Sequence, residues 1–369
     1  MVTIDRKSIG MLFNILKDRG YRIIGPTVRD KAVVYDEIDS VNDLPIGMTD
    51  EQDAAKYRLK KRNDNALFGF VVGPQSWKKY LFPPLLRLLT LKRSGKEFTI
   101  KEDQSNPDKL ALIGVRGCEL NAIFIQDKVF RDGKYADPYY KKIRENILII
   151  AVNCTEPKGT CFCTSMSTGP KAKDGFDISL TEIISDKKHY FIAESGSQTG
   201  DEILTNVPHR EADKNEIQQA EKLLKDASKK MGKRMDTRGI KELLYSNIEH
   251  PEWENVSKRC LTCANCTMVC PTCFCSTVED VTDLTGENAE RWRRWDSCFS
   301  LDYSKVAGGN FRTSPGARYR QWMNHKLASW IDQFGTSGCV GCGRCITWCP
   351  VGIDITEEVR VIRNNPANK

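Results

Sequence analysis

The sequence has little histidine and lacks the common nucleotide-binding loops. Neither G-x-G-x-x-G after a predicted strand nor G-x4-G-K-[ST] occurs, and H-E-x-x-H is also absent. These absences remove the usual signatures of dinucleotide, P-loop and metalloprotease sites, so we expect no flavin or nucleotide in this chain. The four histidines are dispersed and better explained as structural residues than as metal ligands: His189, His209, His250 and His325.

Long apolar runs are missing too. No stretch approaches the length of a membrane span. From Met1 to Lys17 charges are scattered, without the apolar core of a secretory signal. We therefore expect no membrane span and a cytoplasmic location. Fifteen cysteines in such a chain argue against a disulfide framework and for metal ligation in a reducing cell.

One cysteine run has a highly specific spacing. From Cys339 to Pro350 the chain reads C-x2-C-x2-C-x3-C-P, the pattern that holds a [4Fe–4S] cube in bacterial-type ferredoxins. A twin runs from Cys260 to Pro271 with the same spacing and the same closing proline. Zinc sites instead use separated Cys or Cys/His pairs, so two such runs predict iron–sulfur clusters.

In two-cluster ferredoxins the fourth cysteine of each run ligates the other cluster. Crossed ligation predicts one cube on Cys260, Cys263, Cys266 and Cys349. It predicts the second cube on Cys339, Cys342, Cys345 and Cys270. The 68 residues between Cys270 and Cys339 are more than a compact ferredoxin has, but crossed ligation requires only that the runs meet in space.

The formal net charge of +7 suggests nucleic-acid binding at first sight. That count treats every cysteine as neutral. Each oxidised cube with four thiolates carries about −2, so two cubes leave roughly +3 and three leave roughly +1. Much of the basic excess is then offset by the clusters, and we expect no nucleic-acid partner.

Four further cysteines are placed to meet at one sheet edge. Cys118 follows a predicted buried strand, Leu110–Val115, and Cys154 follows a second, Ile147–Val152. The carboxyl ends of parallel strands are where ligands bind. With Cys161 and Cys163 they supply the ligand count of a third [4Fe–4S] cluster. Buried free thiols, or a redox dithiol at Cys161 and Cys163, are the alternatives.

The remaining cysteines are Cys273, Cys275 and Cys298. They could hold a further centre, but we favour thiols close to a cluster, whose weak S–H groups adjust its potential.

The pattern of apolar residues predicts two domains. We expect residues 1–235 to form an α/β (α+β) domain with a small parallel or mixed sheet. This domain contains the four cysteines of the candidate third cluster. Residues 236–369 form an α-helical ferredoxin-like dicluster domain with the 68-residue insertion between its cysteine runs. Helices are expected over Tyr319–Phe334, over Thr277–Asp283 and, broken by two prolines, over Trp77–Leu91.

These cysteine motifs carry a resemblance to a known family. The chain resembles the iron–sulfur β subunit of cytosolic NAD(P)-linked NiFe hydrogenases (sulfhydrogenases), a 4Fe–4S dicluster protein, and is similar to the A component of anaerobic sulfite reductase. The matching stretches are Gly114–Ala122, Ala151–Cys154, Cys161–Pro170, Cys260–Cys275, Arg293–Cys298 and Ser337–Asp354.

The resemblance implies a non-catalytic electron-relay subunit. Its partners would be a flavoprotein subunit that binds NAD(P)H and a catalytic subunit of the NiFe hydrogenase or sirohaem sulfite reductase type. A stand-alone enzyme, with a catalytic cluster or dithiol in the N-terminal domain, is the remaining alternative.

Overall fold

A mixed sheet dominates the N-terminal part of the chain. The computed structural model describes residues 1–71, 73–102, 108–185 and 188–366. Within these ranges the largest sheet has eight strands in the order β12-β1-β11-β10-β9-β8-β2-β3. The four strands β10, β9, β8 and β2 are parallel, and antiparallel strands extend both ends. The strands are β1 (Val2–Asp5), β2 (Arg22–Arg29), β3 (Ala32–Glu37), β8 (Leu110–Val115), β9 (Ile147–Val152), β10 (Ile178–Ser185), β11 (Lys188–Ser195) and β12 (Arg210–Glu211). The expected mixed sheet is present, but it is larger than the small sheet predicted.

The central strands are apolar throughout because both of their faces are covered. All six residues of β8 are buried, as are five of the six in β9. A continuous apolar cluster joins these strands to α1 and α3. The helices of this part are α1 (Ile9–Asp18), α3 (Gly117–Phe130), α4 (Pro138–Glu145), α5 (Gln198–Thr205) and α6 (Lys214–Lys229).

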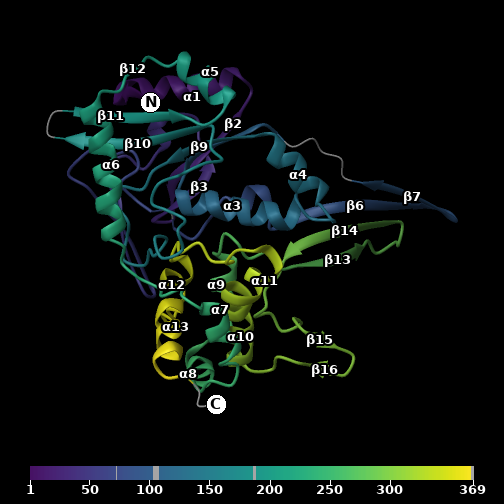
Figure 1. The fold of residues 1–369 in the computed structure, drawn as a ribbon. Coiled ribbons are helices and arrows are strands. Elements are labelled where there is room, and N and C mark those ends of the chain that lie inside the picture. The colour runs from purple at the N-terminus through teal and green to yellow at the C-terminus, as the bar shows by residue number, and fades with distance from the viewer. Residues whose placement is uncertain (72, 103–107, 186–187, 367–369) are drawn as a thin grey trace.

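Short helices form the cysteine-rich part, which lies below the sheet in Figure 1. They pack around a second apolar cluster that includes Leu244, Val256, Trp322 and Leu327. Phe162, from the loop after β9, is fully buried in this second cluster. The helices are α7 (Ile240–Tyr245), α8 (Glu252–Arg259), α9 (Asn265–Met268), α10 (Pro315–Asn324), α11 (Trp330–Phe334), α12 (Arg344–Thr347) and α13 (Ile355–Asn364).

Two sequence predictions are wrong where hairpins form instead of helices. Ser276–Thr282 is strand β13, and only Lys78–Leu81 (α2) is helical in the segment expected as a broken helix. Both segments are extended because they form backbone hydrogen bonds with strand β14 (Asn288–Trp295). A four-stranded sheet in the order β13-β14-β6-β7 projects from the body (Figure 1). Its other strands besides β13 and β14 are β6 (Leu85–Ser94) and β7 (Glu97–Glu102).

Smaller elements complete the described structure. Hairpins are formed by β4 (Met48–Asp53) with β5 (Lys56–Lys61), and by β15 (Lys305–Val306) with β16 (Gly309–Asn310). The predicted helix Tyr319–Phe334 is present as α10 and α11, joined by a π-helical turn at His325–Ser329. Among the helices of the described ranges, none combines the length and apolar character needed to cross a membrane.

Candidate iron–sulfur sites

The two cysteine runs fold into the same loop. In the first run Thr262 and Ala264 have φ angles of 51° and 65°. The equivalent positions of the second run are Gly341 and Gly343, with φ angles of 67° and 76°. Left-handed backbone at these two places turns three consecutive thiols toward one side. A short helix follows in each case, α9 or α12.

Glycine is required in the second run by its neighbours as well as by its backbone. A Cβ on Gly343 would lie 2.2 Å from the carbonyl oxygen of Thr160, and a Cβ on Gly341 would lie 2.6 Å from that of Phe162. The second run therefore packs directly on the loop that carries Cys161 and Cys163.

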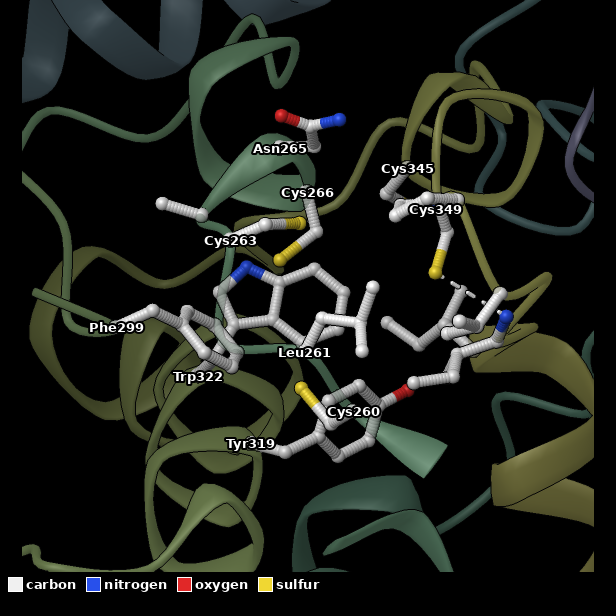
Figure 2. A pocket seen from close by; sticks show the side chains of 15 residues that line it. Cys260, Leu261, Cys263, Asn265, Cys266, Phe299, Tyr319, Trp322, Cys345 and Cys349 are labelled. Atoms are coloured by element: carbon white, nitrogen blue, oxygen red, sulfur yellow. Dashed lines mark hydrogen bonds between the residues drawn. The ribbon is translucent and has the colours of Figure 1, made fainter. Parts of the chain in front are cut away.

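The first candidate site combines cysteines from both runs. Cys260, Cys263, Cys266 and Cys349 line one cavity. Figure 2 shows their sulfur atoms around a common space, which the rings of Tyr319 and Trp322 also line. The structure thus brings the last cysteine of the second run to the first three of the first run, as crossed ligation requires.

Hydrogen-bond donors surround this cavity. The backbone amide of Thr262 donates to Cys260 Sγ at 3.4 Å, and that of Ile353 donates to Cys349 Sγ at 3.3 Å. Tyr319 Oη and Trp322 Nε1 are buried and have no partner among the described residues. Buried donors normally have acceptors, so these two groups fit a site whose occupant carries sulfur acceptors.

The second candidate site contains Cys339, Cys342 and Cys345 with Cys270 of the first run. Burial raises the pKa of Cys345, and the neighbouring sulfurs of Cys339, Cys342 and Cys270 raise it further. Burial likewise raises the pKa of Cys339 to about 12. Metal ligation requires thiolates, so an iron cluster must displace protons from these thiols.

Cys270 is the exception in this group. A hydrogen bond from the Cys273 thiol holds the pKa of Cys270 well below its ordinary value, and the ammonium of Lys326 lowers it as well. Lys326 Nζ lies 3.2 Å from Cys270 Sγ. These two groups therefore favour the charged form of the Cys270 thiol.

The third candidate site lies at the carboxyl ends of β8 and β9. Cys118 is in the first turn of α3, which follows β8, and Cys154 comes directly after β9. Both line one cavity together with Cys161 and Cys163. All four thiols singled out in the N-terminal part thus meet, as the strand ends predicted.

A buried arginine faces these four thiols. Arg116 lines the same cavity, and its guanidinium donates to four backbone carbonyls, those of Phe68, Phe70, Val152 and Asn153. Its Nε is buried without a partner among the described residues. Burial raises the pKa of Cys154, and the positive charge of Arg116 opposes that rise. An anionic cluster with sulfur acceptors suits this arrangement.

The three sites adjoin in a row. Cys342 and Arg344, from the second run, also line the cavity of Cys118. Cys345, from the same run, lines the cavity of Cys260. The site of the second run therefore lies between the other two.

The last three cysteines lie beside these sites. Cys273 contacts Cys270, while Cys275 lies beside Cys298, whose pKa is raised to about 12 mainly by burial. In the described parts of the chain no three His, Cys, Asp or Glu side chains are placed to hold a single metal ion.

Sequence reasoning missed the cations at these sites. Arg116 and Arg344 stand within two residues of a cysteine, in Arg-Gly-Cys and Arg-Cys, which is a signal that could have been used. Lys326 is far from the cysteines of either run in sequence and carries no such signal.

Known proteins support these geometric observations. Residues 259–353 match the family model of the 4Fe–4S dicluster domain. The chain is 30% identical over 354 residues to sulfhydrogenase 2 subunit beta of Pyrococcus furiosus, covering 94% of this chain and 95% of that protein. No solved structure matches. Because this similarity spans nearly the whole of both proteins, the chain belongs to the family of sulfhydrogenase β subunits and is an iron–sulfur electron-transfer subunit.

Proposed function

We propose that this chain relays electrons in the cytoplasm between a flavoprotein subunit that binds NAD(P)H and a catalytic subunit of the hydrogenase type. The relative from Pyrococcus furiosus is a sulfhydrogenase subunit, which supports a hydrogenase partner over a sirohaem partner. A [4Fe–4S] cluster, when bound, accepts and releases single electrons. Three such clusters would be held by residues of this chain.

We assign the ligands according to the three candidate sites. Cys118, Cys154, Cys161 and Cys163 would hold the cluster of the N-terminal domain, residues 1–235. In the dicluster domain, residues 236–369, the middle cluster would be held by Cys339, Cys342, Cys345 and Cys270. The terminal cluster would be held by Cys260, Cys263, Cys266 and Cys349.

The observation that carries this proposal is that the second cysteine run is shared. Cys342 lines the cavity on one side and Cys345 lines the cavity on the other. Neighbouring clusters would then be separated by little more than their own ligands, without a gap of ordinary protein. This supports a continuous path with the middle cluster as its centre.

One end of this path reaches the surface. Cys263 is exposed, and beside it Leu261 and Val351 keep 61% and 39% of their surface exposed. A partner subunit placed over these apolar side chains would approach the terminal cluster closely. We propose this end as one of the two points of electron exchange.

Metal analysis of anaerobically purified protein tests the proposal. Three clusters correspond to about 12 iron atoms per chain with equal sulfide, and two correspond to about 8. In the purified complex, changing Cys154 to serine should stop electron flow from NAD(P)H to the catalytic partner, while each partner keeps its own activity with artificial dyes. Stoichiometric zinc with little iron would refute the proposal.

A further inference from the structure

A buried lysine faces the middle site. Lys326 is only 5% exposed and lies in the π-helical turn His325–Ser329 between α10 and α11. This turn is wider than a turn of α-helix, and three successive residues in it are buried: Lys326, Leu327 and Ala328. Such turns are frequent at functional sites.

All three N–H bonds of this ammonium have acceptors. Nζ lies 3.2 Å from Cys270 Sγ, 3.0 Å from Thr272 Oγ1 and 3.1 Å from the carbonyl oxygen of Gly338. None of the three acceptors is a carboxylate. A buried ammonium is costly without an anionic partner, and among these acceptors only the sulfur of Cys270 can become an anion.

A second buried lysine adds to the positive charge. Lys78 is 4% exposed, and its Nζ donates to the carbonyl oxygen of Cys273 at 3.0 Å while lying 3.8 Å from the centre of the Trp295 ring. Both of these contacts of Lys78 are with neutral groups. The region around Cys270 therefore concentrates cations that thiolate ligands would balance.

The twin site is different. No charged residue is among those that line the cavity of Cys260, Cys263, Cys266 and Cys349 in the described structure. At the position equivalent to Cys270, the donor to Cys349 Sγ within the described ranges is a neutral backbone N–H, that of Ile353. Two runs with identical thiol spacing are thus placed in unequal electrostatic surroundings.

We propose that Lys326 raises the reduction potential of the middle cluster above that of its twin by donating a hydrogen bond to Cys270 and placing a fixed positive charge beside it. Reduction adds one negative charge to a cluster, and a nearby cation in a poorly polarisable interior stabilises that form. The ammonium keeps its proton throughout, so one electron enters and no proton moves. The inference rests on the cluster assignment under the proposed function.

An anaerobic redox titration monitored by electron paramagnetic resonance tests this inference on the full-length protein. Lys326→Met should favour the oxidised form of one cluster by at least tenfold, a fall in midpoint of about 59 mV. The midpoints of the other two clusters should stay in place. Lys326→Arg, which keeps charge and donors, should recover most of the loss.

Two further variants separate the possible causes. Lys326→Gln keeps a donor but loses the charge, so its midpoint should lie between those of the wild type and Lys326→Met. It also provides the test if Lys326→Met does not assemble. Lys258→Met, which removes an exposed lysine two residues from Cys260, should leave every midpoint unchanged because solvent screens that charge.

The outcomes distinguish the two proposals. If the wild-type protein lacks the iron of three clusters, the proposed function fails. If all variants carry full iron and the midpoints of Lys326→Met and Lys326→Gln match the wild type, only the role of Lys326 is overturned. An equal shift in all three midpoints would also overturn it, because the charge would then act without preference for the middle cluster.

Discussion

The backbone amide of Phe162 donates a hydrogen bond to the carbonyl oxygen of Gly341 at 2.8 Å. This bond joins the loop between Cys161 and Cys163 to the loop between Cys339 and Cys342. Thr168 Oγ1 adds a second bond across the same boundary, to the carbonyl oxygen of Val340. The N-terminal thiol site and the second cysteine run are therefore held in one position relative to each other.

We expect Gly343→Ala to destabilise this junction. The new Cβ would meet the carbonyl oxygen of Thr160 at 2.2 Å, in a residue whose φ is 76°. Overpacking and left-handed strain together should cost about 2–4 kcal/mol. The loss should appear as a lower midpoint of thermal unfolding under anaerobic conditions.

Gly335→Ala is the matched control. Gly335 has a φ of 68° but nothing within 4 Å of its added Cβ, so this variant suffers the strain without the collision. Equal melting temperatures for the two variants would show that the contact with Thr160 is not tight.

Crossed ligation gives a second prediction. Cys349→Ser should disturb the cluster of Cys260, Cys263 and Cys266, and Cys270→Ser should disturb that of Cys339, Cys342 and Cys345. Cys349→Ser should alter the same electron paramagnetic resonance signal as Cys263→Ser, and Cys270→Ser should alter the same signal as Cys342→Ser. If Cys349→Ser instead alters the signal that Cys342→Ser alters, each run closes its own cluster.

The third cluster can be tested by counting iron. Cys118→Ser and Cys154→Ser each remove a thiol from the N-terminal cavity, and each should lower the iron content by about four atoms per chain. Cys298→Ala removes a similarly buried thiol that we do not assign as a ligand, so its iron content should equal that of the wild type. A loss of four atoms in Cys298→Ala would require a further cluster beside β13.

Glu358 provides a prediction about pH. Burial, and then a hydrogen bond to Glu252, raises the pKa of Glu358 to about 7, although Arg259 opposes the shift. The pKa of the Glu358 carboxyl in the folded protein is thus higher than its value in the unfolded chain, which is about 4.5. The folded protein holds more protons than the unfolded chain between these values, so this contribution to stability falls as pH rises from about 5 to 7.

Glu358→Gln should remove that dependence. The variant should match the wild type near pH 5 and exceed its stability by up to about 2 kcal/mol near pH 8. Thermal unfolding of both proteins across this pH range measures the difference. A wild type that gains stability relative to the variant as pH rises would contradict the raised pKa.

Much of the candidate site is readable from the sequence because its geometry is local. The spacing within Cys260–Cys266 fixes a loop, and the positions of Cys118 and Cys154 follow from two apolar strands that are neighbours in a parallel sheet. Even the proximity of Cys349 to the first run follows from a general rule, because in two-cluster ferredoxins the fourth cysteine of each run ligates the other cluster. These inferences need only the sequences of short segments and the rule that parallel strands place their carboxyl ends at one edge of the sheet.

The remainder depends on contacts between distant segments. Ser276–Thr282 is a strand because it pairs with β14, which in turn pairs with β6 about 200 residues earlier. Lys326 reaches Cys270 only because a π-helical turn and the loop at Gly338 bring it there. Neither relationship leaves a periodic pattern in the sequence.

The pairing of β6 with β14 also constrains the order of events during synthesis on the ribosome. When β6 leaves the exit tunnel, residues 288–295 have not yet been translated, so one edge of the β6–β7 hairpin has no partner. The first cysteine run, Cys260–Cys270, emerges before that partner does. The four-stranded sheet can therefore close only after the first set of thiols is outside the ribosome and available to iron-delivery factors.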